Sequence, residues 1–308
     1  MAAAVACLLK THMWNPQVAR AHAMLSAAWG GPVALLADET SGPLATPSGL
    51  AKIPYSAAAF AAMGLPIYPD RAKGLWFNCD YPLYVVFDHI DADAAAIVEY
   101  DLVCPHDLRA RVEAMAASTS DFVVHRHRPV PAGVFWEQNA LAWYARHPLP
   151  PGIEMHECLP PFTFIRREAA AELGRSRIAD ARGWRRRATL AKLFLRPRPV
   201  WLFSEMFLGT EPLVRGLSVG HLEAFGDCQR LVYAQPTHWD DIPERPERFY
   251  HPVLSGNAFV ERLMKHVEVV DDWTPQGLAA MRARCRGADE AALFDRRIEG
   301  ELARRQPA

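Results

Sequence analysis

The sequence lacks the short motifs that mark several large enzyme classes. It has no G-x-x-x-x-G-K-[ST] phosphate loop, no G-x-G-x-x-G dinucleotide fingerprint and no H-E-x-x-H pair. These absences argue against P-loop kinases, ordinary NAD dehydrogenases and zincin proteases. No apolar run reaches the ~18 residues that a membrane-spanning helix requires.

Paired cysteines and a leader sequence are missing as well. The six cysteines are scattered without C-x-x-C spacing, which in a chain of 308 residues favours reduced thiols over a disulfide framework. Residues 1–9 are apolar, but no basic residues precede them, and Lys10 and His12 interrupt the run early. This segment predicts a first strand and not a signal peptide, and we expect a cytoplasmic protein.

The chain has no excess charge of either sign. Its 34 basic residues oppose 35 acidic ones, for a net charge of −1. The balance gives no global reason to expect nucleic acid or an anionic membrane as partner. Half of the residues are apolar, and the length suits one large domain or one domain with an appendage.

The most informative feature that is present is an apolar strand ending in two acids. Residues 94–100 are continuous enough for a strand buried on both faces, and Glu99 and Asp101 point to the same side of its end. Ligands bind at the carboxyl ends of parallel strands, where two carboxylates can hold a divalent cation and, through it, a diphosphate. The two acids also fit a strand that simply ends there and leaves the core, because a lone acid-x-acid pattern is weak evidence of a site.

Two other predicted strands, residues 3–9 and 33–37, also end in polar residues. The residues that follow them are Lys10, Thr11, His12, Asp38, Glu39 and Thr40. At a shared sheet edge, Asp38 and Thr40 would bind ribose or base, and Lys10 or His12 would approach phosphate. Ordinary loop polarity explains each of these residues equally well.

Strands and helices alternate along the first half of the chain. We predict helices from Pro16 (with Asn15 as N-cap), at 56–63 (with Ser56 as cap), 75–90, 105–116 and 203–215. We predict further strands at 121–124, 158–165 and 217–223. This order predicts an α/β fold: a Rossmann-like three-layer domain with a mostly parallel central sheet over residues 1–255. Residues 232–249 are predicted as a loop, residues 256–308 as a helical extension, and 289–305 as a solvated or frayed tail.

Further candidates lie around and after the acid-ended strand. Lys73, Asn78 and Asp80 carry groups that could bind base or ribose, although Asn78 and Asp80 also suit helix caps. Glu205 lies among large apolar residues, which raise a carboxyl pKa toward that of a general base, but a glutamate near a helix start also favours the helix dipole.

Histidine and arginine supply the last candidates. His251, between Tyr250 and Pro252, can complete a metal site, although a lone histidine is more often structural; its rivals are His221, His238 and His266. The basic stretch 182–198 fits a solvated helix face, or contact with an acidic sugar, a phosphorylated acceptor or a membrane surface. It lacks the interleaved aromatics of a single-strand nucleic-acid groove.

Several of these segments recur together, and in the same order, in one family. The segments are Lys10-Thr11-His12, Asp38-Glu39-Thr40, residues 76–83, Val98-Glu99-Tyr100-Asp101, Ser204-Glu205-Met206-Phe207 and Tyr250-His251-Pro252-Val253. In this order the chain resembles nucleotide-sugar-dependent glycosyltransferases of the A-type fold, and more closely a bacterial glycosyltransferase-like family.

The resemblance implies a metal-assisted transfer of a sugar from a nucleoside diphosphate donor. Glu99 and Asp101 would stand at the family's D-x-D position, with Glu replacing the first Asp, and His251 would be the carboxyl-terminal ligand of Mn²⁺ or Mg²⁺. Glu205 would be the base of inverting members, although Met206 replaces the second acid of the usual pair. The acceptor would be a glycan, a lipid-linked sugar or a protein, with no nucleic acid involved.

Two other classes of function remain open. One is a non-catalytic nucleotide-sugar or glycan-binding protein of the same fold, which the missing acid at Met206 supports. The other is a metal-dependent hydrolase or nucleotidyltransferase. It would need a glycine-rich phosphate loop after the first strand, where residues 11–14 have none.

Overall fold

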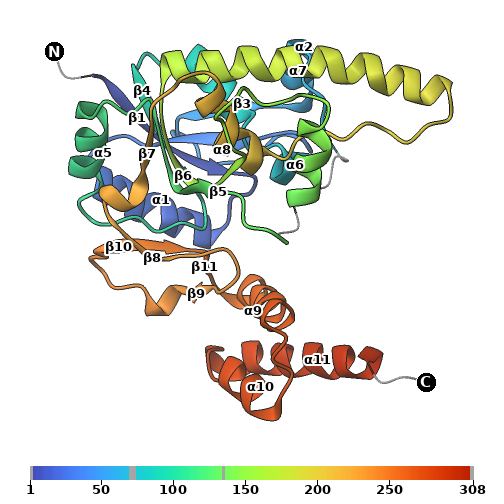
Figure 1. The fold of residues 1–308 in the computed structure, drawn as a ribbon. Coiled ribbons are helices and arrows are strands. Elements are labelled where there is room, and N and C mark those ends of the chain that lie inside the picture. The colour runs from blue at the N-terminus through green and yellow to red at the C-terminus, as the bar shows by residue number, and fades with distance from the viewer. Residues whose placement is uncertain (1–2, 69–73, 134–135, 306–308) are drawn as a thin grey trace.

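The computed structural model describes residues 3–68, 74–133 and 136–305. Its core is a seven-stranded sheet in the order β3-β2-β1-β4-β6-β5-β7 (Figure 1). The strands are β1 (Val5–Thr11), β2 (Ala34–Asp38), β3 (Lys52–Tyr55), β4 (Ala94–Glu99), β5 (Phe122–Pro129), β6 (His156–Arg166) and β7 (Val219–His221). All neighbouring pairs in this sheet are parallel except those made by β6. The predicted mixed α/β fold with a mostly parallel sheet is confirmed.

Helices cover both faces of the sheet. They are α1 (Pro16–Trp29), α2 (Ala57–Met63), α3 (Gly74–Phe77), α4 (Pro82–Val85), α5 (Leu108–Ala117), α6 (Glu137–Tyr144), α7 (Arg167–Leu193) and α8 (Ser204–Val214). Because side chains alternate along a strand, Leu9 and Val98 pack in one core with α1 and α5. Leu8 and Ile97 pack in the other core, with α2, α7 and α8. The sheet is therefore buried on both sides, as the apolar run predicts.

The predicted helix starts are confirmed where a cap residue marks them. The Asn15 side chain accepts a hydrogen bond from the Val18 amide at 2.9 Å, with Pro16 in the first turn of α1. The Ser56 hydroxyl accepts one from the Ala59 amide at 3.2 Å and begins α2. These contacts lie within a few residues along the chain, which is why the sequence reveals them.

The prediction of one helix over residues 75–90 is wrong. The segment contains α3, a turn at residues 78–81, α4 and a 3₁₀ helix at Val86–Asp88. Pro82 has no amide hydrogen with which to continue a helix that arrives from α3, so it begins a new one. The short edge strand β3 is absent from the prediction, because it has only four residues and contains Pro54, which argues against a strand.

The predicted loop at residues 232–249 is only partly a loop. A small region beside the sheet contains two parallel pairs, β8 (Asp227–Leu231) with β10 (Arg248–His251) and β9 (Thr237–His238) with β11 (Val253–Leu254). Backbone hydrogen bonds tie this region to the loop after β4. Val103 and Tyr250 form an antiparallel bridge, and the Val253 amide donates to the Asp101 carbonyl at 2.7 Å.

The chain ends in three helices, α9 (Gly256–Val270), α10 (Pro275–Arg282) and α11 (Gly287–Arg305). They pack around a core of their own that includes Phe259, Leu263 and Phe294. The prediction of a frayed tail at 289–305 is wrong, because Phe294 and Ile298 on α11 are buried. In Figure 1 these helices lie beyond the β8–β11 region. The division at residue 255 stays a prediction. No described helix is long and apolar enough to cross a bilayer.

Candidate functional site

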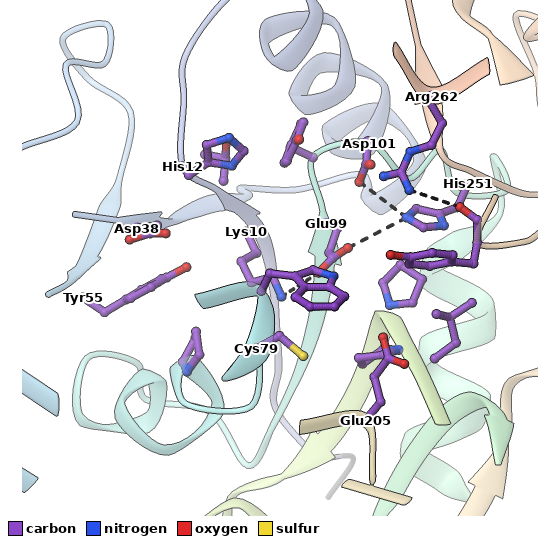
Figure 2. A pocket seen from close by; sticks show the side chains of 18 residues that line it. Lys10, His12, Asp38, Tyr55, Cys79, Glu99, Asp101, Glu205, His251 and Arg262 are labelled. Atoms are coloured by element: carbon purple, nitrogen blue, oxygen red, sulfur yellow. Dashed lines mark hydrogen bonds and ion pairs between the residues drawn. The ribbon is translucent and has the colours of Figure 1, made fainter. Parts of the chain in front are cut away.

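A pocket with a volume of about 230 Å³ opens at the carboxyl ends of β1, β2 and β4 (Figure 2). Of the predicted site residues, it is lined by Lys10, His12, Asp38, Glu99, Asp101, Glu205 and His251. Five further lining residues belong to the segments that carry the resemblance, although no role was predicted for them: Thr11, Trp76, Cys79, Pro82 and Tyr100. The remaining lining residues lie outside those segments: Tyr55, Leu159, Pro160, Pro161, Tyr233 and Arg262. The topology therefore brings together seven of the predicted residues, from five separate segments of the chain.

Glu99, Asp101 and His251 form a cluster with the chemistry of a metal site. One ligand atom from each lies within 4.8 Å of the others. The His251 Nε2 atom is 3.9 Å from Glu99 Oε2 and 3.7 Å from Asp101 Oδ1. These gaps are too long for hydrogen bonds and leave room for a cation between the atoms. Two carboxylates and one imidazole are a donor set that fits Mn²⁺ or Mg²⁺.

The orientation of His251 supports this interpretation. The Val232 carbonyl lies 3.1 Å from Nδ1 and can only accept, so Nδ1 carries the hydrogen and donates it. The lone pair on Nε2 is then free to face the two carboxylates. A backbone carbonyl that fixes the second ring nitrogen is the usual support for a metal-binding histidine. The bridge between Val103 and Tyr250 holds the two chain segments in place.

Lys10 is the direct neighbour of this cluster. It lies opposite Glu99 in the β1–β4 register, and its Nζ is 2.7 Å from Glu99 Oε1. Burial opposes charge on both groups, but each stabilises the other, so the pKa of Lys10 is raised and that of Glu99 is lowered. Burial raises the pKa of Asp101, with His251 opposing and Glu99 adding to the shift. One oxygen of Glu99 faces Lys10 and the other faces His251.

Glu205 lies on the opposite side of the pocket (Figure 2). It occupies the first turn of α8 and is only 7 % exposed. Burial, with smaller contributions from Glu99 and Glu157, raises its pKa to about 8. Within the described part of the chain, no residue donates a hydrogen bond to its carboxylate. A buried, unpaired carboxylate that opens into a pocket is suited to accept a proton near neutral pH.

Arg262 reaches the pocket from α9, in the carboxyl-terminal helices. Its guanidinium lies over the Tyr233 ring, 5.4 Å from the centroid, and its Nη1 is 3.4 Å from the Tyr233 carbonyl. No carboxylate among the described residues is within ion-pair distance of it, although its charge favours the ionised forms of Glu99 and Asp101. Local sequence patterns carry no signal for it, because it joins the site only through packing.

Asn78 and Asp80 are not among the residues that line the pocket. Both are fully buried. Asn78 accepts from the Trp201 indole at 2.9 Å, and Asp80 forms an ion pair with Arg177 at 3.0 Å. The Ser204 hydroxyl also donates to Asp80. These contacts hold the turn at 78–81, and through it they place Cys79 in the pocket.

Thr40 and His238 are candidate residues that do not line the pocket. The Thr40 amide and hydroxyl both donate to the Asp38 carboxylate, at 2.9 and 2.7 Å, so Thr40 orients a lining residue without lining the pocket. Lys73 lies outside the described residues. Among the rival histidines, His238 pairs with Glu290 of α11 and belongs to the packing of the terminal helices.

One G-x-S-x-G match lies at residues 216–220. In the hydrolase elbow, a strand precedes the serine and a helix follows it. Here the order is reversed, because α8 precedes Ser218 and β7 follows it. The Ser218 backbone amide donates to Asp121 at 2.9 Å and fixes the entry into β7. The match therefore lacks the strand–serine–helix order of a nucleophile elbow.

No protein-family model matches the chain, and no curated protein matches it. Among solved structures, it is similar to the apo form of mouse xyloside xylosyltransferase 1. That match has 13 % sequence identity and a TM-score of 0.43, and it covers 82 % of this chain and 98 % of the other. A likeness this weak says nothing of activity.

Proposed function

We propose that this protein transfers a sugar from a nucleoside diphosphate donor to a hydroxyl-bearing acceptor, with a divalent cation held by Glu99, Asp101 and His251. One observation carries the proposal. The metal-type donor set and the buried carboxylate of Glu205 open into the same pocket, at the carboxyl ends of the central strands. Metal-assisted loss of a diphosphate and deprotonation of an attacking hydroxyl need these two groups in one space.

The charged residues at the metal cluster and opposite it have distinct roles in this chemistry. The cation, Mn²⁺ or Mg²⁺, would supply charge neutralisation for the diphosphate that leaves. Lys10 and Arg262 lie on the rim of the cluster and add positive charge toward the same phosphates. Asp38, held by Thr40, accepts hydrogen bonds from a ribose or base. Glu205 accepts the proton of the acceptor hydroxyl as it attacks the anomeric carbon.

A binding protein without turnover is the second candidate. Met206 follows Glu205 where the resemblance expects a second acid, and its side chain is fully buried in the core. No neighbouring carboxylate therefore assists Glu205 from that position. A protein with this arrangement can hold a nucleoside diphosphate sugar in the same pocket and not cleave it.

A nucleotide screen separates the two candidates. We expect nucleoside diphosphates to raise the unfolding temperature in the presence of Mn²⁺ and to have little effect with the metal chelated, because a cation held by the carboxylates would supply the charge that the diphosphate requires. Release of nucleoside diphosphate from the matching nucleotide sugar would then establish turnover. Stabilisation without release favours the binding protein, and no stabilisation by any nucleotide contradicts both candidates.

Replacement of Glu205 by Gln should lower the rate of transfer by about a hundredfold and leave nucleotide affinity unchanged. A base must be ionised to act, so the wild-type rate should rise with pH up to about 8, the pKa of Glu205. Burial disfavours the charged form, so the neutral amide removes no stabilising charge and the fold should persist. A rate profile across pH checks this, with the exposed Glu113→Gln as control. A profile that is flat through pH 8 would refute the assignment.

A further inference from the structure

The carboxyl-terminal part of α7 and the chain after it form a surface that the proposed reaction does not use. Residues 182–198 are here called the α7 tip. Trp184 is the last buried residue of α7, and none of residues 185–198 is buried. In Figure 1 this end of the helix projects beyond the layered domain, and the chain returns as an extended segment. The first half of the helix is thus held by the core, while the tip faces solvent.

The α7 tip exposes large apolar side chains. Leu190 is 46 % exposed, Leu193 70 %, Phe194 68 % and Leu195 96 %. Leu190, Leu193 and Phe194 follow a spacing of three and four residues, so they share one face of the helix. Leu195 has a positive φ of 50°, which is costly for a bulky residue, and its side chain is almost fully exposed.

Positive charge surrounds this apolar face. The basic residues of the tip are Arg182, Arg185, Arg186, Arg187, Lys192, Arg196 and Arg198, and residues 181–200 contain no acid. No ion pair within the described part of the chain involves any of the seven. Arg185 contacts a backbone carbonyl, and Arg198 contacts aromatic rings. A shallow hollow of about 330 Å³ lies between Arg187 and Arg196, floored by Leu190, Ala191 and Phe194.

We propose that the α7 tip docks on a membrane surface that contains anionic lipids. Arginine and lysine meet the lipid phosphates, and Leu193, Phe194 and Leu195 enter the interface between headgroups and acyl chains. The hollow between Arg187 and Arg196 presents cations over an apolar floor, which matches a phosphate above its acyl chains.

Other occupants fit these observations less well. A nucleic acid would leave the exposed leucines without a partner, and Phe194 is the sole aromatic residue among the exposed apolar side chains of the tip. A second copy of the same surface would set seven positive charges against seven, which opposes association. The docking does not depend on the reaction in the pocket, so either proposal can fail alone.

Vesicle sedimentation of the full-length protein tests the docking. We expect it to sediment with vesicles of phosphatidylcholine mixed with phosphatidylglycerol, not with phosphatidylcholine alone, and to be released by high salt. Replacing Leu193, Phe194 and Leu195 together by Ser should weaken binding by about tenfold or more. Replacing Arg186, Lys192 and Arg196 by Gln should weaken it by about fivefold for each residue.

Matched variants elsewhere on the surface serve as controls. Val269 and Val270 are exposed apolar residues of α9, and Arg245 and Arg296 are exposed cations without an ion pair among the described residues. Their replacement by Ser and by Gln, respectively, should leave sedimentation unchanged, and all variants should keep the wild-type unfolding temperature. The proposal is overturned if anionic vesicles do not bind the protein, or if the tip variants bind like the controls. Tighter binding to single-stranded RNA, or a dimer that the tip variants dissociate, would overturn it as well.

Discussion

Replacing Asp101 by Asn should abolish tight binding of Mn²⁺ and lower the rate of sugar transfer by about a thousandfold. Asp101 is 6 % exposed and faces His251 Nε2 at 3.7 Å, so its carboxylate is the least solvated oxygen donor of the cluster. An amide keeps the shape but has no charge with which to hold the cation. Glu99 cannot replace it, because one of its oxygens is already paired with Lys10.

Isothermal titration with Mn²⁺ measures the binding directly, without any assay of turnover. The Asp38→Asn variant is the matched control, because Asp38 lines the same pocket but lies outside the cluster. The Asp38→Asn variant should bind nucleotide more weakly and bind Mn²⁺ with unchanged affinity. If Asp101→Asn bound Mn²⁺ with wild-type affinity, the cluster would not be the metal site, and the proposed reaction would lose its main support.

The second large effect concerns stability. Replacing Arg177 by Met should lower the free energy of unfolding by about 3–5 kcal/mol, because it leaves the Asp80 carboxylate buried without its ion-pair partner. Both side chains of this pair are fully buried, with Arg177 Nε 3.0 Å from Asp80 Oδ2. The guanidinium also lies between the Trp201 and Phe207 rings, and it donates to the Leu202 carbonyl at 2.7 Å.

Chemical denaturation gives the comparison, and the same helix provides the control. Arg175 forms an exposed ion pair with Glu172, so Arg175→Met should cost no more than about 1 kcal/mol. Adding Asp80→Asn to Arg177→Met removes the stranded charge and should recover part of the loss. Equal losses of unfolding free energy for Arg175→Met and Arg177→Met would show that the buried ion pair stabilises the fold no more than the exposed one. Because Asp80 also contacts Ser204, beside Glu205, the loss should extend to the pocket.

The sequence by itself determined the parts of the site that depend on local geometry. The two acids at the end of the apolar run predicted a shared site, and the structure brings Glu99 and Asp101 into one cluster. Strand alternation does not explain this, because β4 ends at Glu99 and Asp101 lies in the turn that follows. The apolar run predicted a doubly covered strand, and Asn15 and Ser56 predicted helix starts through contacts with residues three positions ahead. The sequence also supplied Glu205 as a carboxylate in apolar surroundings.

Tertiary structure alone decided which distant residues join the site. Asn78 and Asp80 are polar residues near the acid-ended strand, yet they turn into the core, where Arg177 and Trp201 lie close enough to pair with them. His251 had three rivals in the sequence. It faces the acids because Tyr250 bridges to Val103 and the Val232 carbonyl fixes its ring.

Arg262 is the clearest example of a pocket residue that the sequence does not reveal. Nothing around it in the sequence distinguishes it from the other arginines of the terminal helices, and it reaches the pocket because α9 packs beside β11. Periodicity and capping record only what a residue's near neighbours along the chain require. The choice of partner across more than a hundred and fifty residues depends on packing and on charges that meet only in the folded protein, here at Glu99, Asp101 and Arg262.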